Sequence, residues 1–185
     1  ADDLDLEKEY VLDIREQNSY NKLHIPGSIF MDKNNILNFI NWVIPREADI
    51  CILSDNREGL KDIYVDLRRI GYSGRISFLA KGINDWIKDK EIGQIKTLTP
   101  KDYQDKKNEY FILDVRKESE VDSKYGEEGI LIPLERIKED YKKIPDRKDI
   151  LVICPTGIRS NIVASFLKSK NIDTKVLIGG LDSIG

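Results

Sequence analysis

The sequence contains little of the chemistry that metal sites, disulfide frameworks and membrane spans require. Among 185 residues there are two cysteines, one histidine and one methionine. Two cysteines do not make a disulfide framework, which favours a reducing, cytoplasmic environment, and no cluster of residues has metal-ligand spacing. No apolar run approaches the roughly 18 residues needed to cross a bilayer, and there is no signal peptide. We therefore expect a cytoplasmic protein with neither a metal nor a membrane partner.

The sequence also lacks an excess of charge of one sign. Its net charge is -3 although 34% of the residues are charged, because lysines are interleaved with acids. That pattern is typical of a solvated surface and argues against a nucleic-acid partner. A chain of this length and 40% hydrophobic content can bury one large core or two small ones.

What the chain does contain is an internal repeat at a spacing of about 100 residues. Three short segments recur in the same order, and the pairs are 10–16 with 111–118, 50–54 with 150–154, and 79–83 with 177–181. Three ordered matches are improbable by chance. We predict two copies of one domain, residues 1–92 and 99–185, joined by a linker at residues 93–98.

Within each copy, short β-branched runs alternate with helical periods. The expected strands lie near residues 10–14, 50–54, 76–79, 110–115, 150–153 and 175–178. The clearest helices are expected at 58–70, with a buried face that includes Tyr64, and at 160–170. A further helix over 99–107 has Thr99 as its cap and Pro100 in its first turn. This alternation predicts an α/β fold in which each copy is a parallel sheet flanked by helices on both faces.

The segment that begins at Cys154 carries the most chemistry. It follows an apolar strand and precedes an amphipathic helix, so the cysteine lies where a strand ends. Loop amides and a helix N-terminus both favour negative charge, which lowers the pKa of a cysteine. Gly157 permits a tight turn, Arg159 supplies a cation, and Ser160 is expected to cap the helix. The alternative is a small buried cysteine without reactivity.

Cys51 and His24 suit structural roles better. Cys51 lies inside an apolar strand, with no glycine or cation beside it, and we expect it to pack in the core. His24 is the only histidine, and we expect it to cap a turn before Pro26 rather than to act in catalysis.

In these segments the chain resembles the rhodanese family of sulfurtransferases, as a tandem pair. The second copy matches through Leu113-Asp-Val-Arg-Lys-Glu118, Ile132-Pro-Leu134, Cys154-Pro-Thr-Gly-Ile-Arg-Ser160 and Gly179-Gly180. The first copy matches through Leu12-Asp-Ile-Arg-Glu16, His24-Ile-Pro-Gly-Ser-Ile29 and Lys81-Gly-Ile-Asn-Asp-Trp86. The Cys-x-x-Gly-x-Arg-Ser loop is the most specific of these signals.

The resemblance implies that Cys154 is a nucleophile that takes a sulfane sulfur from a donor and carries it as a persulfide. The sulfur would be cradled by the loop residues Pro155, Thr156, Gly157, Ile158, Arg159 and Ser160. Arg159 would bind anionic donors such as thiosulfate, and Asp114 and Arg116 would brace the loop. A thiol or cyanide would then accept the sulfur, and no cofactor is implied. The implied partners are small sulfur-containing anions, low-molecular-weight thiols or a sulfur-acceptor protein.

The first copy departs from the family pattern at the decisive position. It has Ser54 where the thiol should stand, followed by Asp55 and Asn56, either of which is expected to cap the next helix. We interpret it as an inactive copy that packs on the second, shapes its entrance or docks a partner. The second copy departs in a smaller way, because residues 180–184 lack the family's terminal tryptophan.

Three alternatives remain open. Related phosphatases use a Cys-x5-Arg loop, whereas only four residues separate Cys154 from Arg159, which by analogy suits sulfur better than phosphate. A non-catalytic binding module is the second alternative. An inactive copy before an active one also resembles the C-terminal half of bacterial fusions with an upstream metallo-β-lactamase-like persulfide dioxygenase. Because the chain starts at Ala1 without a methionine, we expect a processed product or a piece of such a protein, against a stand-alone enzyme.

Overall fold

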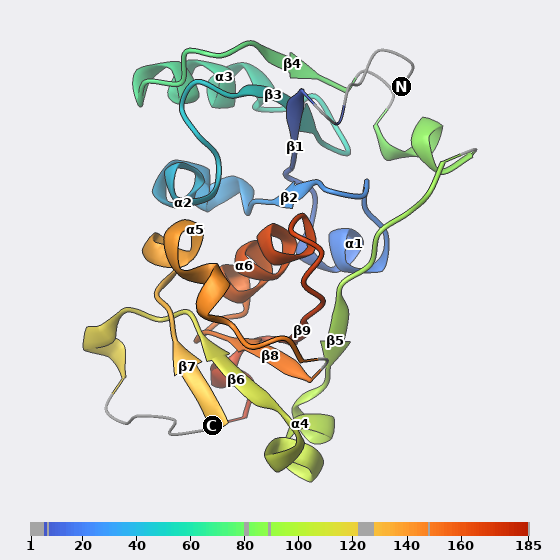
Figure 1. Ribbon diagram of the computed structural model, residues 1–185. Helices are drawn as coiled ribbons and strands as arrows, with labels where there is room; N and C mark the ends of the chain where they lie inside the picture. The colour runs from blue at the N-terminus through green and yellow to red at the C-terminus, as the bar shows by residue number, and fades with distance from the viewer. Residues whose placement is uncertain are drawn as a thin grey trace. The chain divides into compact units, whose positions relative to one another are not determined.

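The computed structural model describes residues 6, 8–79, 82–88, 90–121, 128–147 and 149–184. The chain divides into two compact units, residues 1–94 and 95–185, coloured from blue to green and from green to red in Figure 1. Each unit is a parallel sheet flanked by helices, so the predicted α/β fold is confirmed.

The first unit is built on a four-stranded parallel sheet with the order β2-β1-β3-β4. The strands are β1 (Glu9–Asp13), β2 (Ile29–Phe30), β3 (Asp49–Leu53) and β4 (Ile76–Phe78). Its helices are α1 (Gln17–Lys22), α2 (Ile36–Val43) and α3 (Leu60–Arg69). The central strands β1 and β3 are almost entirely buried, because helices and loops cover both faces of a parallel sheet.

The second unit has a five-stranded parallel sheet with the order β5-β9-β8-β6-β7. The strands are β5 (Lys96–Leu98), β6 (Phe111–Asp114), β7 (Gly129–Leu131), β8 (Ile150–Ile153) and β9 (Lys175–Leu177). Its helices are α4 (Pro100–Lys106), α5 (Ile137–Asp140) and α6 (Ile158–Lys168). In Figure 1, α5 and α6 lie on one side of this sheet and α4 lies on the other.

The strands lie close to their predicted positions, two details differ, and one helix agrees with its prediction. Residues 96–98 belong to the stretch interpreted as a linker, yet they pair with β9 as the edge strand β5. Helix α3 begins at Leu60, and Tyr64, expected on its buried face, is 38% exposed. Helix α4 agrees with its prediction, because Thr99 caps it by accepting a hydrogen bond from the Asp102 N–H at 3.1 Å.

Helix α6 is buried on nearly every side. Eight consecutive residues from Ser160 to Leu167 are buried, among them Ile162, Val163, Phe166 and Leu167. A helix that is buried all round has little freedom to shift against its sheet. The loop between β8 and α6 is therefore held between two buried elements.

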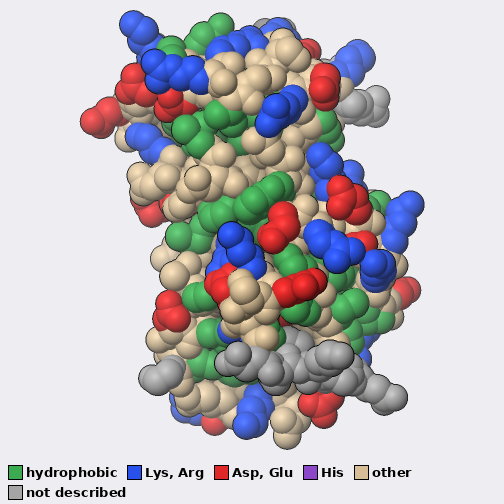
Figure 2. All heavy atoms as spheres, turned by 90° about the vertical axis from the view of Figure 1, so that its left-hand side faces the viewer, with side chains coloured by type: hydrophobic (Ala, Val, Ile, Leu, Met, Phe, Trp, Pro, Cys, Tyr) green, Lys and Arg blue, Asp and Glu red, His purple; other side chains and the backbone are tan. Residues whose placement is uncertain are grey.

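The surface carries mixed charge. On the face seen in Figure 2, basic and acidic side chains alternate over the surface, as the interleaved sequence predicts. In the part of the chain that the structure describes, no helix is long and apolar enough to cross a membrane.

Candidate functional site

The predicted cysteine loop connects the central strand β8 to the buried helix α6. Strand β8 ends at Ile153 and α6 begins at Ile158, so only residues 154–157 lie between them. Gly157 is the N-cap of the helix, with a left-handed backbone at φ 87°, a conformation that residues with a Cβ adopt at a cost. The turn is therefore tight enough to curl around the cysteine side chain.

The sulfur of Cys154 lies against hydrogen-bond donors. The N–H groups of Gly157 and Ser160 donate to Sγ at 3.2 and 3.4 Å, and the Ser160 hydroxyl lies 3.1 Å from it. Donors directed at a sulfur stabilise its negative form. Cys154 and Ser160 have no exposed surface, so these contacts replace water around the sulfur.

The opposite side of the loop is held by the turn that follows β9. The N–H groups of Leu181 and Asp182 donate to the carbonyl oxygens of Cys154 and Pro155, each at 2.9 Å. A Cβ placed on Gly180 would lie 2.2 Å from the Pro155 oxygen and 2.5 Å from the Cys154 oxygen. Only glycine permits this approach, which directs two loop carbonyls away from the sulfur.

Two details of the predicted cradle need correction. Ser160 does not cap the helix, because Gly157 is the cap and Ser160 lies in the first turn. Its hydroxyl instead lies near the cysteine sulfur and 3.3 Å from the Gly157 oxygen. Pro155 has no N–H, so the amides that can face a bound sulfur begin at Thr156.

Arg159 is paired with Glu120, a residue that the sequence interpretation missed. Its guanidinium donates to both carboxylate oxygens, at 2.7 and 2.8 Å, and the Lys117 N–H donates to Glu120 at 2.8 Å. These contacts lower the pKa of Glu120 to about 2, while the Glu120 carboxylate raises the pKa of Arg159. The available signal was positional, because β6 and β8 are neighbours and loops at their carboxyl ends meet.

Asp114 and Arg116 connect this pair to the sheet. Asp114, at the end of β6, is completely buried and accepts Arg116 Nε and Nη2 at 2.9 and 2.7 Å. Arg116 Nη1 donates to the Glu120 carbonyl at 3.2 Å. Asp114 and Arg116 thus hold the segment that presents the Glu120 carboxylate to Arg159.

The first unit has a longer loop at the equivalent place. Strand β3 ends at Leu53 and α3 begins at Leu60. The connecting loop, residues 54–59, therefore has six residues, whereas the equivalent loop of the second unit, residues 154–157, has four. The helix is capped by Gly59 at φ 72° without a side-chain bond, so the expectation that Asp55 or Asn56 caps it is wrong. Asn56 instead accepts the Glu58 N–H at 3.1 Å within the loop.

Cys51 is a core residue, as predicted. It is 4% exposed in β3, and burial raises the pKa of its thiol. His24 lies between the end of α1 and Pro26. The ring of His24 is completely buried and stacks on the ring of Tyr20, with 4.2 Å between the ring centres. Its Nδ1 atom lies 2.9 Å from the backbone carbonyl oxygen of Tyr20.

The motif residues Ala80 and Lys81 lie outside the described residues. Within the described ranges, no group of three or more His, Cys, Asp or Glu side chains could hold a metal ion.

Comparison with known proteins identifies the repeat. A family model described as a rhodanese-like domain matches residues 1–89 and again residues 99–185. No curated protein matches the chain.

Solved structures of the same kind are similar at low identity. A rhodanese-related protein from Thermoplasma volcanium is 28% identical over 48% of this chain and 89% of its own, with a TM-score of 0.44. A rhodanese homolog from Thermus thermophilus is 22% identical over 48% of this chain and 99% of its own, at 0.40. Thiosulfate sulfurtransferase from Pseudomonas aeruginosa is 20% identical over 96% of this chain, at 0.42, and this chain spans 39% of its length.

Proposed function

The chain belongs to the rhodanese-like domain family, with two copies of the domain, and we propose that the second copy is a sulfurtransferase. In this proposal Cys154 carries the transferred sulfur as a persulfide. The first copy has no thiol in its equivalent loop, because Ser54 stands there, and it does not react.

The contacts of the Cys154 sulfur carry this proposal. Two backbone N–H groups and one hydroxyl lie within 3.4 Å of Sγ, whereas an inert core cysteine needs no polar neighbour. Donors arranged in advance stabilise the charge of an attacking thiolate without reorganisation. The same donors suit the outer sulfur of a persulfide, which also carries negative charge.

The proposed reaction has two displacement steps. The Cys154 thiolate attacks the outer sulfur of thiosulfate, a sulfur–sulfur bond forms as the donor's bond breaks, and the electron pair leaves with sulfite. A thiol or cyanide then attacks the outer sulfur of the persulfide, and the Cys154 thiolate is regenerated. No electrons enter from outside, so the step needs no cofactor. Persulfides and polysulfides fit the same scheme as donors.

Arg159 already has a partner at the proposed donor site. Its side chain is 18% exposed and already paired with Glu120. A charge-assisted bidentate pair is stronger than a neutral hydrogen bond, so an anionic donor has to compete with the Glu120 carboxylate. We therefore propose that Arg159 binds donors by exchanging that partner.

A second candidate function rests on the burial of the thiol. Because Cys154 has no exposed surface, a non-catalytic binding module of the same fold is the main alternative. A Cys-loop phosphatase has less support, because the loop is one residue shorter than Cys-x5-Arg and Glu120 holds both terminal nitrogens of Arg159. A cytoplasmic location, small thiol or acceptor-protein partners, and an upstream persulfide dioxygenase domain remain parts of the proposal.

Intact mass spectrometry tests the sulfurtransferase proposal. The full chain is incubated with thiosulfate, a polysulfide or a low-molecular-weight persulfide, and one extra sulfur atom is expected, removable by cyanide. Cys154→Ser should abolish the adduct and all turnover, while Cys51→Ala, at the other buried cysteine, should retain both. An unmodified chain with every donor contradicts the proposal and favours the binding module, whereas Cys154-dependent hydrolysis of an aryl phosphate favours the phosphatase.

A further inference from the structure

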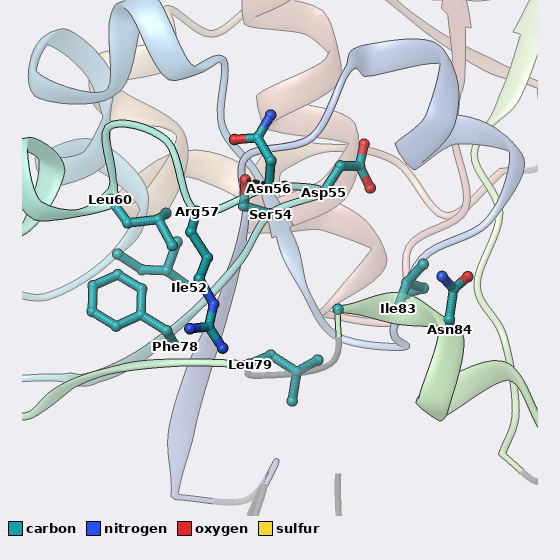
Figure 3. A pocket seen from close by; sticks show the side chains of 11 residues that line it. Ile52, Ser54, Asp55, Asn56, Arg57, Leu60, Phe78, Leu79, Ile83 and Asn84 are labelled. Carbon is teal, nitrogen blue, oxygen red and sulfur yellow. Dashed lines mark hydrogen bonds between the residues drawn. The ribbon is translucent and has the colours of Figure 1, made fainter.

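The first unit contains a cavity at the edge of its sheet where the second unit has the cysteine loop. Its volume is about 540 Å³, and it lies between the loop 54–57 and the turn 82–84, over the ends of β3 and β4 (Figure 3). The carboxyl ends of parallel strands are the usual place for a ligand in such sheets. Pockets for small molecules have volumes of about 300–1,000 Å³, so this cavity is of suitable size.

The cavity exists because the longer loop is not drawn onto the following turn. A Cβ on Gly82 would lie 3.6 Å from the Ser54 oxygen, whereas one on Gly180 would lie 2.2 Å from the Pro155 oxygen. In the second unit, Leu181 and Asp182 bind the loop carbonyls. Among the described residues of the first unit, no hydrogen bond joins turn 82–84 to loop 54–59. The space that hydrogen bonds close in one copy is open in the other.

Among the described residues, the lining combines apolar side chains, which form its floor, with one cation, Arg57, and one carboxylate, Asp55. Ile52 and Ile83 are buried, Leu79 lies beside them, and Phe78 leaves 39% of its surface exposed. In Figure 3 the Arg57 side chain extends from the loop in among Ile52, Phe78 and Leu79, whereas Asp55 points away from this floor. Arg57 is exposed, and a guanidinium is more weakly hydrated than an ammonium, so it can pair with an anion while its stem lies against apolar side chains.

Two further observations favour an anion at this place. Among the residues whose placement is described, no carboxylate forms an ion pair with Arg57. Helix α3 also begins beside the cavity at Leu60, with ten residues to Arg69, and its N-terminal amides favour negative charge. A small inorganic ion would satisfy Arg57 but would leave the apolar floor uncovered.

We propose that this cavity binds a small organic anion with a flat apolar body, of the aryl sulfonate or aryl carboxylate class. The apolar body covers the floor against Phe78 and Leu79, and the anionic group pairs with Arg57. The site is separate from Cys154 and does not depend on sulfur transfer. In this proposal the first copy binds a small molecule and does not transfer sulfur.

Two fluorescent probes test the site on the full chain: anilinonaphthalenesulfonate and its uncharged analogue phenylnaphthylamine. The sulfonate should bind about tenfold more tightly than the neutral analogue, the difference that one charged hydrogen-bonded pair contributes. Arg57→Ala should remove that preference and leave the binding of the neutral analogue unchanged. Arg57→Lys should keep part of the preference for the sulfonate, because lysine retains the positive charge but lacks the bidentate donor geometry of a guanidinium.

Two controls separate this site from other surfaces. Arg69→Ala changes an exposed arginine at the far end of α3 and should leave both affinities unchanged. Cys154→Ser should also leave them unchanged, so loss of sulfur transfer and loss of this site remain distinguishable. The proposal is overturned if the sulfonate binds wild type and Arg57→Ala equally, or if Arg69→Ala weakens it as much as Arg57→Ala.

Discussion

The two copies share a strand, a loop and a helix at the same place and differ in how the loop closes. In the second copy four residues connect β8 to α6, and the turn after β9 binds the loop carbonyls. In the first copy six residues connect β3 to α3, and a cavity opens between loop and turn. The two sheets are alike, so the difference between a closed cysteine loop and an open pocket lies in the length of the loop and in its closure against Gly180 or Gly82.

The aspartate–arginine pair belongs to the part that the copies share. Asp13 binds Arg15 through Nε and Nη2 at 2.9 and 2.7 Å, and Asp114 binds Arg116 in the same way. The first copy has no thiol in its equivalent loop and still keeps this pair. We therefore infer that the pair stabilises the fold that both copies share. What only the second copy adds is Glu120, which connects this pair to Arg159.

The most demanding test of the comparison moves the thiol between copies. The double variant Ser54→Cys/Cys154→Ser is expected to have no catalysed sulfur transfer, because the six-residue loop does not surround position 54 with the donors found at Cys154. Thiosulfate-to-cyanide transfer by the full chain is the measurement, with Cys154→Ser alone as the background. Activity above that background would show that the shared scaffold, and not the short loop, activates the thiol.

The paired aspartates should differ in their effect on stability. Asp13→Asn leaves Arg15, whose side chain is 3% exposed, as an unneutralised buried charge, which should cost about 3–5 kcal/mol. Asp114→Asn should cost about 2 kcal/mol, because Arg116 is 19% exposed and keeps the Glu120 carbonyl. Urea denaturation of each variant measures the difference. Equal losses would mean that the exposure of the arginine does not matter.

The glycine pair tests how the loops close. Gly180→Ala places a methyl group 2.2 Å from the Pro155 oxygen at φ 64°, and it should cost about 2–4 kcal/mol and reduce sulfur loading of Cys154. Gly82→Ala also places a side chain at a positive φ, 62°, but its nearest neighbour lies at 3.6 Å, so it should cost about 1 kcal/mol. Denaturation and intact mass measure both effects. A Gly180→Ala chain that loads normally would argue against closure by this turn.

The smallest expected effect concerns the pH dependence of the Glu120–Arg159 pair. The pKa of Glu120 in the folded chain is about 2, below its ordinary 4.5, so its contribution is present above pH 4.5 and is lost as the pH falls toward 2. The carboxylate is 34% exposed, so the contribution should stay within about 1 kcal/mol. Glu120→Gln should flatten the stability curve between these pH values. The neighbouring variant Glu118→Gln keeps the Glu120–Arg159 pair and serves as the control.

The sequence predicts the elements more reliably than the contacts between them. The positions of β1, β3, β6 and β8 follow from short apolar runs, and α4 follows from its Thr99 cap. Tyr64 was misplaced because helical spacing alone does not reveal how far the sheet reaches. Strand β5 was missed because an edge strand of three residues, two of them exposed, has no clear apolar pattern.

The repeat, the α/β alternation and the difference between Cys154 and Ser54 follow from residue type and local spacing, so the amino-acid sequence alone predicts them. The partner of Arg159, the turn that closes the loop at Gly180, and the open cavity beside Arg57 are found only in the folded chain. These depend on residues that are far apart in the chain and meet at the carboxyl edge of a parallel sheet. Residue spacing along the chain does not predict these long-range contacts, because they depend on the order in which the strands pair in the sheet.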